Sequence, residues 1–227
     1  MRALFILTLA ALGMASCSER HAYESKACQA QYEKRIHGPL LRVAVAFGYK
    51  DSRPDRWVAD RAERLAFESQ IAEMGFVLGR GDVDWLDPHL SYLPYSIWTL
   101  KRWPKGEPLA DPTQVELVIW DSTLGPDDEV NRKDPYLRDH LRSLQAVWES
   151  ALRNSHWLFY NGHSRDGGGP DFAPPRLTQD KHVDYTWYTK SQQQLADLLS
   201  GLTTHKSRDN LRIFGIYSCA STQHFAG

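Results

Sequence analysis

Two apolar segments of this chain each end on a side chain that can do covalent chemistry. The segment His156–His163 ends in an imidazole, and the segment Leu211–Cys219 ends in a thiol. Short apolar runs of this kind predict buried strands, each with its reactive residue at the carboxyl end. Ligands of open α/β sheets bind beyond the carboxyl ends of the strands. If the two strands are neighbours, His163 and Cys219 meet there, and a thiol beside an imidazole is the minimal equipment of a thiol hydrolase.

In such a hydrolase Cys219 is the nucleophile, and His163 is the general base that later protonates the leaving group. A free thiol has a pKa of about 8.5, so it needs this neighbour to become a thiolate at neutral pH. The alternative is that Cys219 is an unreactive core or disulfide-bonded residue. The sequence holds three cysteines, and a Cys28–Cys219 disulfide is one such account.

The loop that follows His163 contains three consecutive glycines, at positions 167–169. Glycines permit close backbone approaches, and backbone N–H groups in such a turn can point at an anionic or developing oxyanion atom. Arg165, Asp166 and Asp171 lie near the predicted mouth of the site and are candidates for contact with substrate. The alternative is that they are solvated loop charges.

The remaining pattern predicts an α/β three-layer sandwich with a mainly parallel sheet. Further strands are expected at 40–48, 76–78 and 114–120, and helices at 55–74, 134–153 and 191–202. The first strand, the first helix and the second strand together predict a parallel βαβ unit. Residues 79–113, rich in Pro and Trp, are expected to be irregular and to form an insertion or a functional rim.

The two strand ends, with Cys219-Ala220-Ser221 after the second, resemble the caspase-like cysteine peptidases, a group that includes legumains, gingipains, clostripain, separases and caspases. Cys219 follows His163 by 56 residues (219 − 163), and in caspases the separation is about 50. The resemblance covers residues 40–221. It implies a parallel α/β sheet with the His at the end of one strand and the Cys at the end of the next. It also implies peptide or protein substrates and an oxyanion hole made by the backbone N–H groups of Ser164 and Cys219.

The chain departs from this family in two places. Ser164 stands where the family has Gly directly after the His, and the chain stops eight residues after Cys219 (227 − 219). The family continues there with a helix and strands that build the substrate pocket, so we expect the domain at 39–227 to be incomplete after residue 221. One alternative is therefore a non-catalytic envelope lipoprotein that uses the same fold as a binding or scaffold module. Another is a domain that binds a small ligand or a sugar.

The first residues predict export. Arg2 and the apolar run Ala3–Leu12 read as a signal peptide over residues 1–16, and Met14–Cys17 resembles a bacterial lipobox. We expect Cys17 to be lipidated and residues 17–38 to be a polar tether. In the lipoproteins this resembles, a residue such as Ser18 after the Cys implies the outer membrane, which predicts an anchored protein of the bacterial cell envelope facing the periplasm. The alternative is an ordinary cleaved signal.

The charge balance and the motifs give no reason to expect a nucleic acid, a metal or a cofactor. Lys plus Arg number 27 and Asp plus Glu 28, a formal net charge of −1, so the balance gives no reason to expect a nucleic acid as partner. Neither HExxH nor CxxC occurs in the sequence. We therefore expect no metal and no cofactor.

Overall fold

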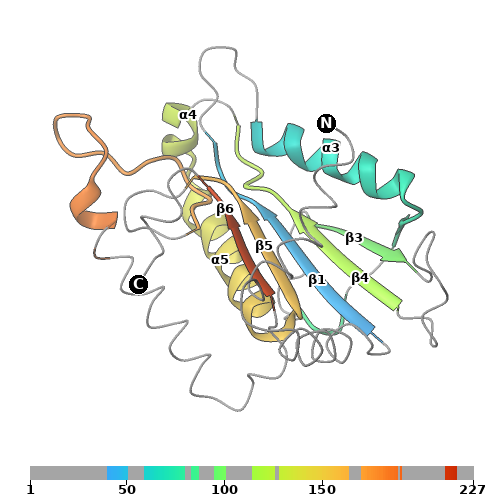
Figure 1. Cartoon of the computed structure of the whole chain (residues 1–227). Coiled ribbons are helices and arrows are strands. Elements are labelled where there is room, and N and C mark those ends of the chain that lie inside the picture. Colours follow the sequence, from blue (N-terminus) through green and yellow to red (C-terminus); the bar gives the residue numbers. More distant parts are fainter. Residues whose placement is uncertain are drawn as a thin grey trace, which may run out of the picture.

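The computed structural model of the chain describes residues 40–50, 59–79, 83–86, 95–100, 114–125, 128–163, 170–188, 190 and 213–218. Within them the chain forms an α/β fold built on a mixed six-stranded sheet of order β2-β3-β4-β1-β5-β6 (Figure 1). The strands are β1 (Leu40–Phe47), β2 (Val77–Leu78), β3 (Tyr95–Leu100), β4 (Gln114–Trp120), β5 (Trp157–Asn161) and β6 (Ile213–Tyr217). The helices are α3 (Ala59–Glu73), α4 (Asp128–Lys133) and α5 (Leu137–Asn154).

The strands β4, β1, β5 and β6 run parallel to one another, and each lies in a segment that the sequence predicts as a strand. They are apolar along most of their length because both faces of the sheet are covered. In β1, Ala44 and Ala46 point into the core on one face, whereas Val43 and Val45 point into the core on the other. The prediction that the His163 and Cys219 segments are neighbouring strands is confirmed for β5 and β6.

Two expectations about the first half of the chain are wrong. The strand β2 pairs antiparallel with β3 and not with β1, so the predicted parallel βαβ unit does not form. The strand β3, which also pairs antiparallel with β4, lies in the stretch expected to be irregular. It is only 6 residues long and its neighbourhood is rich in proline. Ile97 and Trp98 nevertheless alternate between the two cores, as strand residues do. The sheet is therefore mixed: it is parallel from β4 through β1 and β5 to β6, and antiparallel where β2 and β3 join it.

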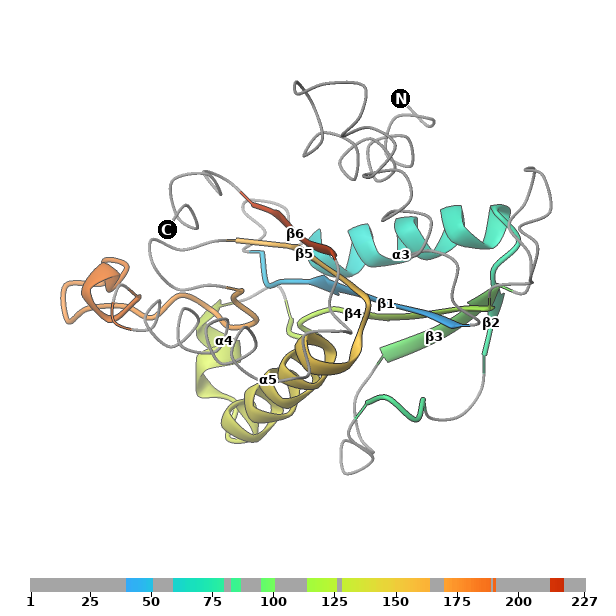
Figure 2. The same cartoon turned by 60° about the horizontal axis from the view of Figure 1, so that its bottom comes forward.

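The described helices cover both faces of the sheet, which gives three layers (Figure 2). α5 covers one face with an apolar stripe at helical spacing, and Leu144, Trp148 and Leu152 are buried on it. This helix was predicted from Asp134 with Pro135 in its first position. It begins at Leu137 instead, because the Asp134 carboxylate accepts the N–H of Tyr136 at 2.9 Å and holds the intervening residues in a turn. The short helix α4 before that turn was not predicted.

α3 covers the other face, and it ends where the sequence predicts. Gly75 has φ +94°, a left-handed conformation that Gly adopts without a steric cost. Its N–H donates to the carbonyl of Ala72 at 3.0 Å, and the N–H of Phe76 donates to that of Ile71 at 3.1 Å. These two bonds form a Schellman motif, which satisfies the last carbonyls of the helix. The start predicted at Asp55 and the helix predicted at 191–202 lie outside the described residues.

No helix in the described part of the chain has both the length and the apolar composition needed to cross a bilayer.

Candidate active site

The carboxyl ends of β5 and β6 place the two reactive segments side by side. Asn161, the last residue of β5, is paired in register with Tyr217, the last residue of β6. The pairing continues past the strand ends, because the N–H of Gly162 donates to the carbonyl of Tyr217 at 3.2 Å. His163 comes next and is half-buried. Cys219 follows Tyr217 by the same two residues by which His163 follows Asn161.

Most of the other predicted site residues lie outside the described part of the chain. These are Cys219 itself, Ser164, Arg165, Asp166 and the lipidation candidate Cys17. His163 and Asp171 are the two predicted site residues that the structure describes, and they flank the undescribed residues 164–169. The proposed roles of the undescribed residues stay predictions.

Asp171 has a structural environment rather than an open one. It is 9 % exposed, and its carboxylate accepts the N–H of Ala173 at 3.0 Å and lies 3.4 Å from the hydroxyl of Tyr188. Its backbone carbonyl also accepts the N–H of Tyr49, which follows β1, at 2.9 Å. These contacts tie Asp171 to the residue just after β1 and to residues that follow it in the chain. They lend no support to the prediction that Asp171 contacts substrate.

A charged cluster that the sequence did not indicate lies at the carboxyl end of β5, where Asn161 precedes His163 by two residues. The Nζ of Lys50, just after β1, lies 2.5 Å from the Oε2 of Glu63 on α3. The Asn161 amide donates to the same carboxylate oxygen at 2.9 Å, and its carbonyl oxygen accepts from Lys50 at 3.3 Å. These three residues come from the segment after β1, from β5 and from α3, so no local pattern could have grouped them. They fix the side chain of the residue at which β5 ends, and they bring one cation and one anion to the edge that carries His163.

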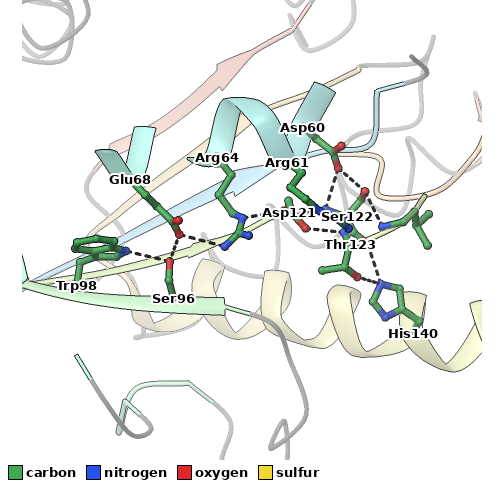
Figure 3. A network of polar contacts seen from close by, with 11 residues as sticks. Asp60, Arg61, Arg64, Glu68, Ser96, Trp98, Asp121, Ser122, Thr123 and His140 are labelled. Carbon is green, nitrogen blue, oxygen red and sulfur yellow. Dashed lines mark hydrogen bonds and ion pairs between the residues drawn. The ribbon is translucent and has the colours of Figure 1, made fainter. Parts of the chain in front are cut away.

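A second polar network lies at the carboxyl end of β4 (Figure 3). Asp121 is 1 % exposed; its Oδ2 accepts from the Nε of Arg64 at 2.8 Å, and its Oδ1 accepts the N–H of Thr123 at 2.7 Å. Ser122 is fully buried, and its backbone N–H donates to the Oδ2 of Asp60 at 3.1 Å. The Ser122 hydroxyl donates to that same oxygen. Burial raises the pKa of Asp60, and the neighbouring Asp121 carboxylate raises it further, while the Ser122 bonds oppose the shift.

Thr123 adopts a left-handed conformation with φ +55°. This is unusual for a β-branched residue, and such strain persists only where the surroundings enforce it. Here the enforcing contacts are visible in Figure 3. The Nε2 of His140, on α5, lies 2.8 Å from the carbonyl oxygen of Ser122 and also contacts the Thr123 hydroxyl. The network therefore joins α3, β4 and α5 through one turn at the carboxyl end of β4.

Within the described residues, no three His, Cys, Asp or Glu side chains gather closely enough to hold a metal ion. Comparison of the chain with protein-family models, curated proteins and solved structures found no match.

Proposed function

We propose that this chain is a cysteine hydrolase that cleaves peptide bonds with a Cys219–His163 dyad on a caspase-like sheet. One observation carries the proposal: β5 and β6 are parallel neighbours, and Asn161 pairs in register with Tyr217. Adjacent strands are about 4.8 Å apart. His163 and Cys219 each follow this pair by two residues, so the two segments leave the sheet side by side. The thiol and the imidazole can then come within hydrogen-bonding distance of each other.

The proposed reaction follows from the two groups. His163 takes the proton of the Cys219 thiol, and the thiolate attacks the carbonyl carbon of the scissile bond to give a tetrahedral oxyanion. The backbone N–H groups of Ser164 and Cys219 stabilise that oxyanion. The intermediate collapses as His163 protonates the departing amine, which leaves a thioester on Cys219. Water, deprotonated by His163, then attacks the thioester and releases the acid and the free thiol.

The cellular setting is part of the same proposal. A signal peptide over residues 1–16 and a lipidated Cys17 would place the hydrolase on the bacterial cell envelope, with residues 17–38 as its tether. Buried acyl chains contribute about 0.8 kcal/mol per CH₂, so a multiply acylated cysteine anchors a protein firmly. Residues 1–39 lie outside the described part of the chain.

Labelling tests the dyad directly. The full chain is treated at pH 7 with peptidyl acyloxymethyl ketone probes that vary in their first residue, and the modified cysteine is located by mass spectrometry. We expect Cys219 to be labelled in the wild type, not at all in Cys219→Ala, and at least about tenfold more slowly in His163→Ala. His182→Ala is the matched control, because His182 is exposed in a turn outside the site, and it should label as the wild type does.

Equal labelling of His163→Ala and the wild type would contradict the dyad. Mass spectrometric mapping of the unreduced protein tests separately whether Cys219 is free or disulfide-bonded. A Cys28–Cys219 disulfide would exclude a resting thiolate and favour the non-catalytic envelope lipoprotein as the function of this fold.

A further inference from the structure

We infer that Tyr160 is a positioning residue for His163. Its hydroxyl donates a hydrogen bond to the His163 carbonyl and thereby fixes the backbone of the general base beyond the end of β5. The inference rests on the proposed dyad. His163 lies two residues beyond the end of β5 and one residue beyond Gly162, whose N–H still donates to the carbonyl of Tyr217. Gly162 precedes it, and a glycine leaves the backbone more freedom than any other residue. Some other contact must therefore hold His163.

The Tyr160 hydroxyl makes that contact. It lies 2.9 Å from the carbonyl oxygen of His163 and 3.0 Å from that of Asp171, so its single proton is shared between the two. Its oxygen accepts the N–H of Asp171 at 2.9 Å. One hydroxyl thus bonds the residue before segment 164–169 and a residue just after it. Three partners on a single oxygen make this hydroxyl a junction between the two chain segments.

The ring that carries this hydroxyl is itself fixed. Tyr160 has no exposed surface. Its ring packs edge-on against Trp148 of α5, with centroids 5.9 Å apart and planes at 77°, and against Phe172, at 5.8 Å and 85°. Aromatic pairs favour this geometry. The packing of the ring in the core therefore fixes the position of the hydroxyl. The hydrogen bond from the hydroxyl in turn fixes the position of the His163 carbonyl.

Two glycines make room for the hydroxyl. A Cβ added at Gly48 would lie 2.0 Å from the Tyr160 oxygen, and one at Gly162 would lie 2.3 Å from it. Gly48 follows β1 and Gly162 follows β5, which are neighbouring strands. Each strand is thus followed by a residue without a side chain, and both glycines border the Tyr160 hydroxyl. The space they leave is occupied by the hydroxyl that bonds the His163 carbonyl.

The experiment measures the alkylation rate of Cys219 by iodoacetamide between pH 5 and pH 9 in the full chain, with each cysteine quantified by mass spectrometry. His163→Ala first establishes the profile of a thiol without its base. We expect Tyr160→Phe to shift the wild-type profile toward that of His163→Ala, with at least about a fivefold lower rate at pH 6.5. Tyr188→Phe is the matched control, because it removes another buried tyrosine hydroxyl, one that contacts Arg176 and the Asp171 side chain, and it should stay within about twofold of wild type.

The outcomes separate the two claims. If His163→Ala already matches the wild type, the dyad itself is wrong. If His163→Ala differs but Tyr160→Phe matches the wild type, the dyad stands and the positioning role of Tyr160 is overturned. Should Tyr160→Phe not fold, p-aminophenylalanine and p-fluorophenylalanine at position 160 replace it, since both fill the space of the hydroxyl but only the first donates a hydrogen bond. The amino variant should keep the wild-type profile and the fluoro variant lose it, and identical profiles would overturn the inference.

Discussion

Replacing Asp60 with Asn should remove a specific dependence of stability on pH. Asp60 is fully buried, one carboxylate oxygen accepts both Ser122 bonds, and the other oxygen has no partner. Burial, together with the nearby Asp121 charge, raises its pKa above the ordinary value of 3.8. Between 3.8 and the raised pKa, the folded state keeps a proton that the unfolded state has lost. The stability contributed by protonated Asp60 is thus complete below 3.8 and is lost as the pH rises through the folded-state pKa.

The size of the effect follows from linkage. In that pH interval the free energy of unfolding falls by up to about 1.4 kcal/mol per pH unit, and each unit of upward pKa shift costs the same amount at neutral pH. Asn cannot titrate, and its single carbonyl oxygen can accept both Ser122 bonds. Asp60→Asn should therefore match the wild type near pH 4 and become progressively more stable than it as the pH rises, before the difference levels off above the folded-state pKa.

Urea denaturation followed by tryptophan fluorescence measures this, because Trp120 and Trp148 are almost fully buried. The free energy of unfolding is determined at intervals from pH 4 to pH 8, and the difference between variant and wild type is plotted against pH. Other titrating groups are common to both proteins and largely cancel in that difference. Asp139→Asn is the matched control for the loss of one carboxylate, since the Asp139 side chain is 75 % exposed. A flat curve for Asp60→Asn would refute the reasoning.

Two further substitutions test the packing and the charge network, each in the same denaturation assay. Gly162→Ala should lower the free energy of unfolding by about 2 kcal/mol or more, because its Cβ would lie 2.3 Å from the buried Tyr160 hydroxyl and 2.8 Å from the Cα of Gly48. Gly125→Ala, whose Cβ would meet only the Asn131 side chain at 3.4 Å, should lower it by less than about 1 kcal/mol. Arg64→Gln removes the close partner of Asp121, which is 1 % exposed, and should cost about 3 kcal/mol. Arg142→Gln breaks an ion pair whose side chains are 72 % and 75 % exposed and should cost less than about 0.5 kcal/mol. Equal losses within either pair would contradict the role assigned to burial.

The parallel part of the sheet could be predicted because its signal is local and strong. A strand covered on both faces is apolar along most of its length, and β1, β4, β5 and β6 all show this. That β5 and β6 are neighbours was implied by the resemblance to caspase-like peptidases and not by any local pattern. β2 and β3 carry a weaker signal: β2 has 2 residues, both exposed, and β3 is short. Their antiparallel pairing is decided by tertiary contacts that no local pattern records.

In the candidate site, too, only the features with a local sequence signal could be predicted. His163 could be found because it ends an apolar run, and a reactive side chain there is a local feature of the sequence. The Lys50–Glu63–Asn161 cluster could not, since its members are brought together by the pairing of β1 with β5 and the placement of α3. Asp171 was identified from its position after a glycine loop, but sequence position does not reveal that its carboxylate is already bonded within the fold.

The attachment of α3 explains why both polar groupings lie at the same edge. Ile71 is the only fully buried apolar residue on this helix within the described chain, so apolar packing alone holds it weakly. Asp60, Arg64 and Glu68 recur every four residues and therefore share one face, which bonds to Ser122, Asp121 and Ser96 in turn (Figure 3). Glu63 bonds Lys50 and Asn161, the last residue of β5. The helix is thus fastened to β4 on one side and to β1 and β5 on the other by charged and hydroxyl groups. Because these bonds span the strand ends, the helix that closes one face of the sheet also fixes the relative positions of the strands that would carry the chemistry.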